Sequence, residues 1–251
     1  MSGTSGLLLV TGGSRGIGAA VARLAARDGF AVMVNYLAEA AAAAAVVAAI
    51  TDAGGQAWSV QGDMGQEADV LRLFAAADAT GMRLAGLVNN AGITGGFARG
   101  AEVTAATLRH VLAVNVEGAI LAAREAVRRM STAHGGQGGA IVNVSSRAAQ
   151  LGGSGEWVHY GASKGAIDTL TVGLAREVAN EGVRVNAVSP GLIETDIHAA
   201  AGEPGRIARM VSSIPMRRAG TPDEVAEAVM WLLSPAASYV TGANLPVSGG
   251  R

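Results

Sequence analysis

Two side chains four residues apart, Tyr160 and Lys164, have the types and the spacing for acid catalysis. A carbonyl that accepts a hydride also needs a proton on its oxygen, and the best donor has a pKa near the working pH. A free tyrosine, with a pKa of about 10, is too weak an acid by roughly 3 units, or about 4 kcal/mol. A nearby cation favours the phenolate and lowers that pKa. Since residues four apart share a helix face, we expect Lys164 to act on Tyr160 in this way.

Lys164 is the only lysine in the sequence, which has arginine at every other basic position. An isolated Tyr-x-x-x-Lys pair is most often a surface contact between turns of a helix. This pair is accompanied by the serines 145 and 146 after an apolar run, and by a glycine-rich loop near the start of the chain. The combination favours a catalytic pair over a surface contact.

Short apolar runs alternate with longer segments of helical periodicity along the chain. This alternation predicts an α/β fold: one domain over residues 1–251, with a doubly wound parallel sheet of about seven strands and helices on both faces. The alanine-rich segment 38–50 is expected to form the second crossover helix, because alanine is the best helix former. The other expected helices lie within 17–28, 66–79, 104–131, 162–180 and 222–233, and the expected strands within 6–10, 30–36, 56–63, 84–90, 139–146 and 182–189.

The segment 192–220 interrupts this rhythm and contains Gly202, Pro204, Gly205 and Pro215. Loops of this kind often close over a site. We predict a mobile substrate lid here, with an inert surface excursion as the alternative.

Glycines at 12, 16 and 18 follow the first expected strand and open a helix. Gly12 would permit the tight turn, Gly16 the close approach of a pyrophosphate, and Gly18 the contact between helix and strand. Free N–H groups at the helix start would receive the phosphates. The alternative is a plain glycine-rich turn, but at this place in an alternating α/β chain the pattern favours a dinucleotide site.

The second expected strand ends in Asn35 and Tyr36, where an NAD site would carry an acid for the ribose 2′-hydroxyl. The first carboxylate after it is Glu39, and Arg15 in the glycine loop could face a 2′-phosphate. These residues favour NADP over NAD, although Leu37 supplies no second cation and Arg15 could be a solvated loop residue.

Composition excludes several classes of function. The 19 basic and 20 acidic residues nearly cancel, so the composition lacks the positive charge typical of proteins that bind nucleic acid or an anionic membrane surface. There is no cysteine, and the four histidines lack ligand spacing, so no metal site is expected. The first ten residues lack the basic region and the long apolar run of a signal peptide, which predicts a cytoplasmic protein.

Several motifs together resemble the short-chain dehydrogenase/reductase superfamily, over essentially the whole chain. They are "TGGSRGIG" at the glycine loop, "NNAG" at 89–92, "YGASK" at 160–164 and "SPGLIET" at 189–195. The segments "GVRVNAVSPG" and "YVTGANLPVSGG" look most like the 3-oxoacyl reductase and glucose dehydrogenase branch. The resemblance implies a Rossmann-type fold, an NAD(P)-dependent oxidoreductase acting on CH–OH or C=O groups, and a homotetramer.

The resemblance places the family's catalytic tetrad on Asn115, Ser146, Tyr160 and Lys164. Ser146 would hydrogen-bond the substrate oxygen, and Asn115 would hold a water that links Lys164 to solvent. Ser145 is the alternative serine, but the family's serine stands three residues after the asparagine that is Asn143 here. The interval from Ser146 to Tyr160 is one residue longer than expected, which affects the shape of the pocket more than its chemistry.

The resemblance also implies cofactor contacts in the glycine loop and after the second, third, fourth and sixth strands. Asp63 could instead cap the helix that begins near Gln66. The implied residues are Gly12, Ser14, Arg15, Gly16, Ile17, Gly18, Asn35, Tyr36, Asp63, Met64, Asn90, Ala91, Gly92, Tyr160, Lys164, Pro190, Gly191, Ile193 and Thr195.

The substrate pocket is expected to be partly apolar, with four side chains that could meet hydroxyl groups. An enzyme for a carrier-bound oxoacyl substrate would need a basic rim around the pocket to bind an acidic carrier protein. Arg128 and Arg129 could contribute to such a rim, but two arginines are too few to form it. We therefore expect NADPH-dependent reduction of a small ketone, with a 3-oxoacyl-carrier reductase or a sugar or polyol dehydrogenase as alternatives. A non-catalytic nucleotide-sensing scaffold is the alternative of another class. The expected apolar walls are Phe97, Leu151, Trp157 and Ile197, and the polar ones Gln150, Glu156, His159 and His198.

Overall fold

The computed structural model describes residues 6–251, and within this range seven strands form one parallel sheet. The strand order is β3-β2-β1-β4-β5-β6-β7, so the chain winds outward from β1 in one direction and then in the other. This confirms the predicted doubly wound sheet. The strands are β1 (Leu7–Val10), β2 (Ala31–Tyr36), β3 (Ala57–Gln61), β4 (Leu84–Asn89), β5 (Gly139–Val144), β6 (Val183–Pro190) and β7 (Asn244–Val247).

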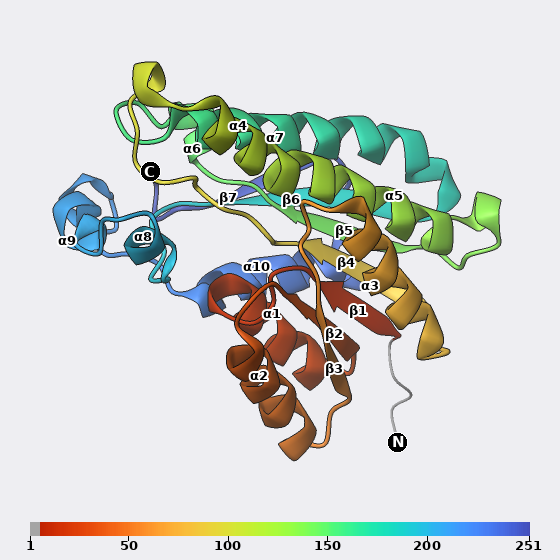
Figure 1. Ribbon diagram of the computed structural model, residues 1–251. Helices are drawn as coiled ribbons and strands as arrows, with labels where there is room; N and C mark the ends of the chain where they lie inside the picture. The colour runs from red at the N-terminus through yellow and green to blue at the C-terminus, as the bar shows by residue number, and fades with distance from the viewer. Residues whose placement is uncertain (1–5) are drawn as a thin grey trace.

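Helices cover both faces of the sheet, which explains the near-continuous apolar runs of the strands (Figure 1). Every residue of β1 is buried: Leu8 and Val10 belong to the core on one face, and Leu7 and Leu9 to the core on the other. The first face carries α1 (Gly16–Arg27), α2 (Ala40–Asp52) and α10 (Pro222–Leu233), and the second carries α3 (Glu67–Ala79), α5 (Gly118–Met130) and α7 (Val158–Val178).

The alanine-rich segment forms α2, as predicted. Ala43, Val46 and Ile50 recur at helical spacing and are its buried residues. The remaining alanines therefore serve helix propensity more than the core.

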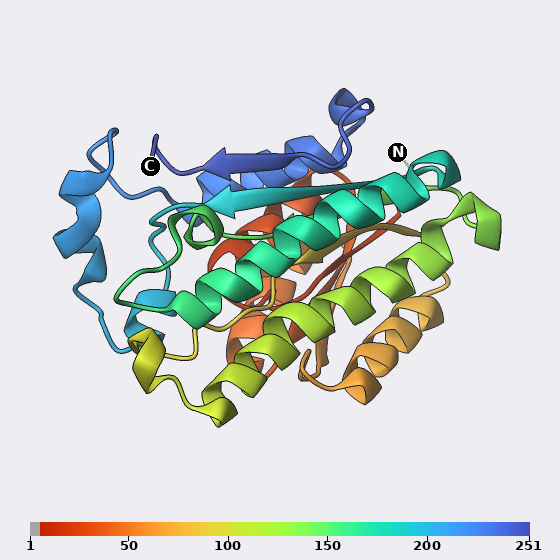
Figure 2. The ribbon, with the colours of Figure 1, turned by 90° about the horizontal axis from the view of Figure 1, so that it is seen from above.

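The segment expected as one helix over 104–131 is divided in the structure. α4 (Ala105–Leu112) leads into a π-helical turn (Ala113–Glu117), which continues as α5 (Figure 2). The first residue of α5, Gly118, leaves no room for a side chain, because a Cβ there would clash with the main-chain oxygen of Met64. By length and composition Ala105–Met130 could cross a membrane. In the structure α5 instead packs on β4 and α3, in the core of the fold.

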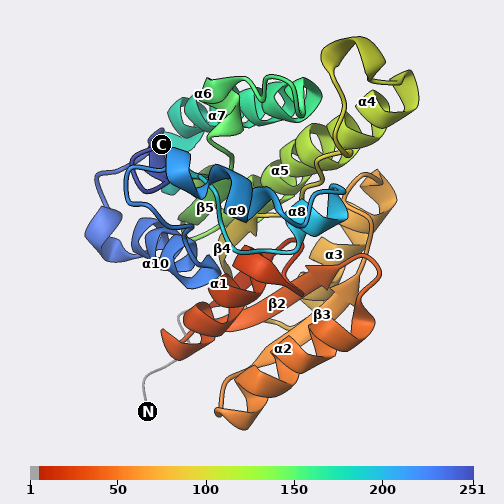
Figure 3. The ribbon, with the colours of Figure 1, turned by 90° about the vertical axis from the view of Figure 1, so that its left-hand side faces the viewer.

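The predicted lid segment lies beside the carboxyl ends of the strands (Figure 3). It contains the short helices α8 (Ile197–Ala200) and α9 (Arg206–Met210), and a further short helix, α6 (Ala148–Leu151), precedes α7. An isolated bridge between Ile193 and Gly220 joins the two ends of the segment. Its mobility and the single domain over 1–251 stay predictions, the latter including residues 1–5 outside the described range.

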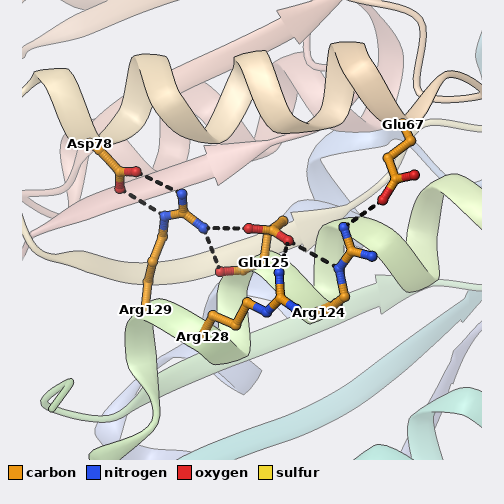
Figure 4. A network of polar contacts seen from close by, with 6 residues as sticks. All are labelled: Glu67, Asp78, Arg124, Glu125, Arg128 and Arg129. Atoms are coloured by element: carbon orange, nitrogen blue, oxygen red, sulfur yellow. Dashed lines mark hydrogen bonds and ion pairs between the residues drawn. The ribbon is translucent and has the colours of Figure 1, made fainter. Parts of the chain in front are cut away.

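A network of charged side chains joins α3 to α5, with the buried Glu125 at its centre (Figure 4). Burial opposes ionisation of Glu125, but hydrogen bonds from Arg129 and Arg124 outweigh it and hold the pKa of this carboxyl below its usual range. Arg128 and Arg129, the arginines considered for a basic rim, are both engaged here. The members are Glu67, Asp78, Arg124, Glu125, Arg128 and Arg129.

We expect Glu125→Gln to lower the free energy of unfolding by about 1–3 kcal/mol, because a buried charged acceptor is lost while the partly exposed arginines can be solvated again. Only the ionised carboxylate of Glu125 stabilises the fold in this way. The wild type should therefore have the higher free energy of unfolding at neutral pH, and the difference should disappear as the pH falls below about 4.3. Urea unfolding of both proteins checks this. The control is Glu67→Gln, which removes an exposed ion pair and should lower the free energy of unfolding by less than about 1 kcal/mol. Equal stability of the Glu125→Gln variant and the wild type would contradict it.

Candidate active site

The glycine loop between β1 and α1 is held by close backbone contacts. Gly12 has a φ of +60°, and a Cβ there would lie 2.9 Å from Cα of Ala91. A Cβ on Gly18 would lie 2.5 Å from the main-chain oxygen of Gly12. These contacts fit the roles predicted for the two glycines, because any larger side chain would push the loop away from β4.

The end of β4 is tied to this loop through Asn90. Its Nδ2 donates to the main-chain oxygens of Thr11 and Gly12, at 3.0 and 2.9 Å. The Oγ1 of Thr11 accepts from the main-chain N–H groups of Asn90 and Ala91. The two segments expected to meet a dinucleotide are therefore built as one unit.

Asn35 is buried at the end of β2, and its amide is engaged within the fold. Its Oδ1 accepts from the N–H of Gly12, and its Nδ2 donates to the main-chain oxygen of Gly62 at 2.9 Å. The side chain thus positions the glycine loop, and its predicted contact with the cofactor stays a prediction. Asp63 begins the turn before α3: its Oδ1 accepts from the N–H of Gly65, and it does not cap the helix itself.

Asn115 lies in the π-helical turn before α5 and is buried. Its side chain exchanges two hydrogen bonds of 2.8 Å with the main chain of Ile93, and its Nδ2 also donates to Oγ of Ser163. Asn115 therefore fastens the segment after β4 to α7. Its predicted water contact stays a prediction.

The two serines after β5 point to different surroundings. Ser145 is buried, with its Oγ within hydrogen-bonding distance of Asp168 and the main-chain oxygen of Lys164. Ser146 and Tyr160 line the same cavity, and the Ser146 hydroxyl is near enough to the phenol to act on its pKa. The geometry thus favours Ser146, as the sequence spacing did, for contact with a substrate oxygen.

Tyr160 lies in the first turn of α7 and packs against Trp157, with ring centroids 5.7 Å apart. Burial raises the pKa of Tyr160, and the opposing effects of the Ser146 hydroxyl and of the Arg206 charge are smaller. This direction is opposite to the lowering expected from Lys164, whose Nζ lies 5.8 Å from the ring centroid. Desolvation of the phenolate outweighs the effects of Ser146 and Arg206, so the phenol keeps its proton at neutral pH.

Lys164 is buried one helical turn after Tyr160. Its Nζ donates to the main-chain oxygen of Val144 at 2.7 Å. Burial lowers the pKa of Lys164 to about 8, with Asp168 opposing the shift. The ammonium is thus predominant at neutral pH and is lost just above it.

A cavity of about 570 Å³ opens beside these residues at the carboxyl ends of the strands. Its volume is within the range expected for small-molecule sites. Residues of the glycine loop, the hydroxyl groups of Ser146 and Tyr160, and the loop after β6 all line it. Of the predicted site residues, those that line the cavity are Ile17, Asn90, Gly92, Ser146, Tyr160, Lys164, Pro190, Gly191, Ile193 and Thr195. Those that do not line it are Gly12, Ser14, Arg15, Gly16, Gly18, Asn35, Tyr36, Asp63, Met64, Ala91 and Asn115.

The substrate walls differ in part from the prediction. Leu151, Trp157 and Ile197 line the cavity, but Phe97 instead stacks on Trp157 at 4.8 Å. Gln150 donates to Asp168. The other polar walls also differ: His159 is buried off the cavity, Glu156 is paired with arginines, and burial lowers the pKa of the lining His198.

Four arginines that the sequence motifs did not indicate also line the cavity. They come from three distant parts of the chain, so no local motif marks them, and only Arg147, next to Ser146, had a neighbour that could have pointed to the site. The four are Arg147, Arg206, Arg209 and Arg251.

The site as a whole brings the glycine-rich loop, a protonated phenol and a serine hydroxyl to one cavity. A family model described as enoyl-(acyl carrier protein) reductase matches residues 12–251. The chain belongs to the short-chain dehydrogenase/reductase superfamily. It is an oxidoreductase of that superfamily, whose members bind NAD(P).

Relatives of this short-chain dehydrogenase/reductase cover almost its whole length. The "Uncharacterized oxidoreductase YgfF" of Escherichia coli is 53% identical over 98% of this chain and 99% of its own. "Glucose 1-dehydrogenase 2" of Bacillus subtilis is 36% identical over 96% of this chain and 93% of its own. A solved short-chain dehydrogenase of Burkholderia cenocepacia, in complex with NADP, is 34% identical with a TM-score of 0.89, covering 97% of this chain and 96% of that one.

Proposed function

We propose that this enzyme reduces a small ketone with NADPH, using Ser146, Tyr160 and Lys164. The observation that carries the proposal is that the side chains of Ser146, Tyr160 and the buried Lys164 line one cavity, which also reaches Ile17 at the glycine loop. A substrate oxygen placed between the two hydroxyls would meet both a hydrogen-bond donor and an acid.

A bound NADPH would supply the hydride for the carbonyl carbon. The Ser146 hydroxyl would donate a hydrogen bond to the carbonyl oxygen and orient it. Tyr160 would transfer its phenolic proton to the same oxygen, so that hydride and proton together give the alcohol. The ammonium of Lys164, on the same side of α7, would stabilise the phenolate left on Tyr160. Asn115 would act through Ser163 and the segment at Ile93, by fixing their positions.

The preference for NADPH is supported by the residues after β2 and in the glycine loop. Arg15 is about half exposed, and its guanidinium lies 4.0 Å from Glu39 and 3.7 Å from Asp196. Such long, exposed ion pairs are weak, so Arg15 is available to a 2′-phosphate. The NADP complex of the Burkholderia relative supports NADP as a cofactor of this fold.

We expect Arg15→Ala to lower kcat/KM with NADPH by about tenfold or more and to leave that with NADH nearly unchanged, because a hydrogen bond to a charged phosphate contributes about 1.5–3 kcal/mol. Initial rates with both cofactors and one ketone check this. Arg23→Ala, at an exposed arginine of α1, is the control. A wild-type enzyme that prefers NADH would contradict the proposal.

The alternatives within the family are a 3-oxoacyl-carrier reductase and a sugar or polyol dehydrogenase. The name of the Bacillus relative supports the sugar reading. Against a carrier-bound substrate, the Glu125 network engages Arg128 and Arg129, so they do not form a free basic rim. A non-catalytic scaffold would bind NADPH without turning over any ketone or alcohol.

We also propose a cytoplasmic homotetramer, with α4, α5, α7 and the last strand, β7, at its interfaces. The support is the resemblance stated above and the exposed apolar side chains Leu108, Leu112, Ile120 and Val172 on these helices. A monomeric mass by light scattering would refute this assembly.

A further inference from the structure

The cavity wall carries far more positive than negative charge. Among the described residues that line it, four arginines and Lys164 face a single carboxylate, that of Glu156. His198 does not add to this excess, because burial lowers its pKa and so favours the neutral ring. A cavity with such an excess is suited to an anionic ligand.

Two of the arginines already have a carboxylate. Arg206 and Arg209 bind the two oxygens of Glu156, at 2.7 and 2.9 Å, and Arg209 also pairs with Glu203. Arg206 is buried, and its guanidinium lies 4.4 Å from the ring centroid of Trp157. This cluster fastens α9 to the segment before α7 and fixes the position of the Arg206 charge.

Arg251 has no such partner. Within residues 6–251, neither a hydrogen bond nor an ion pair is formed by its guanidinium, although the residue is half-buried. Burial lowers the pKa of Arg251, and the charges of Arg206 and Arg147 lower it further, while Glu156 opposes them. Arg147 lies alongside, with its Nε donating to the main-chain oxygen of Arg251 at 2.7 Å. A half-buried cation beside two others is stabilised when an anion binds it.

This charge lies close to the reacting end of the cavity. Arg147 directly follows Ser146, and the charge of Arg206 is near enough to act on the Tyr160 phenol. The Arg206 guanidinium lies 4.4 Å from the centroid of the Trp157 ring, which in turn lies 5.7 Å from that of Tyr160. The three guanidiniums and the two hydroxyls line the same cavity of about 570 Å³, so an anion bound by the arginines would share this cavity with the reacting carbonyl.

We infer that the substrate is a short oxo acid, or the matching hydroxy acid, whose carboxylate is bound by Arg251 with support from Arg147 and Arg206. The inference rests on the proposed function and narrows its substrate class. Arginine suits this role, because its planar guanidinium matches a carboxylate with two parallel hydrogen bonds. Neutral sugars and simple ketones would leave the charge of Arg251 without a partner.

The test compares acids with their nearly isosteric amides: acetoacetate with acetoacetamide, and levulinate with levulinamide, each with NADPH. For at least one pair we expect kcat/KM to be at least about tenfold higher for the acid, mainly through KM, as expected for a charged hydrogen bond. Arg251→Gln should reduce this preference to less than about threefold, and Arg251→Lys should restore part of it. Arg23→Gln, on the outside of α1, is the control for loss of one positive charge and should keep the full preference. Thermal unfolding of each variant reports whether it is folded.

Calorimetric titration of the enzyme with acetoacetate and levulinate, in the presence of NADP, keeps this inference separate from the proposed function. Binding of either acid that is lost in Arg251→Gln would support the anion site even if no ketone were turned over. The inference would be overturned if neutral ketones were turned over and each acid had the same kcat/KM as its amide. It would also be overturned if folded Arg251→Gln kept the full preference for the acid. Either result would leave the proposed function standing. Absence of acid binding by calorimetry would also overturn the inference.

Discussion

Replacing Tyr160 with phenylalanine should lower kcat by about 100- to 10,000-fold, the range that a positioned general acid contributes. The substitution removes only the hydroxyl beside Ser146, and the ring can keep its contact with Trp157. We therefore expect the fold and the affinity for NADPH to be almost unchanged. Initial rates on a responsive ketone, with calorimetric binding of NADPH, separate the loss of chemistry from a loss of binding.

A matched control is available in Tyr239, which is fully exposed. Tyr239→Phe removes the same atom away from the cavity and should keep wild-type turnover. If Tyr160→Phe were to retain turnover within about twofold of the wild type, Tyr160 would not be the acid and the mechanism would be wrong.

Lys164→Arg should lower turnover by about 100-fold or more, even though the charge is kept. The Nζ of Lys164 is buried against the main-chain oxygen of Val144, and a Cβ on Gly92 would lie only 3.3 Å from it. A guanidinium is wider and planar, so it cannot replace the ammonium there without moving its neighbours. Thermal unfolding measures that strain. Lys164→Met, which removes the charge without a wider head, should be equally inactive if the ammonium is required.

The pH profile of the wild type gives a further measure of Lys164. Because burial lowers its pKa to about 8, kcat/KM should fall as the pH rises through that value and the ammonium is lost. The free energy of unfolding should instead rise as the pH increases from about 8 to about 10.4, the ordinary pKa of lysine. In this range the unfolded chain binds more protons than the folded one. A guanidinium does not titrate in this range, so the residual activity of Lys164→Arg should lack the descending limb. A wild-type profile flat to pH 10 would contradict this role for the ammonium.

The sheet was predictable because buried parallel strands are nearly continuous in apolar residues, as β1 shows at every position. The helical segment 104–131 was correctly predicted as helical but not as divided. The π-helical turn at Asn115 depends on contacts with Ile93 and Ser163, which are remote in sequence and leave no mark on the local periodicity.

The candidate site was predictable where local motifs carry it, as at Gly12, Tyr160 and Lys164. The direction of the Tyr160 pKa was not predictable, because burial is a property of the folded cavity and outweighs the effects of the Ser146 hydroxyl and the Arg206 charge. Asn35 shows the same limit: its place at the end of β2 was right, but its amide holds Gly12.

The central claim is that this short-chain dehydrogenase/reductase uses NADPH to reduce small ketones at the Ser146–Tyr160 pair. The most direct measurement follows NADPH consumption over a panel of neutral ketones and oxo acids, with the matching alcohols and NADP in the reverse direction. We predict turnover of at least one ketone that is faster with NADPH than with NADH and is lost in Tyr160→Phe. NADPH binding without turnover across the whole panel would contradict the claim and favour a nucleotide-sensing scaffold.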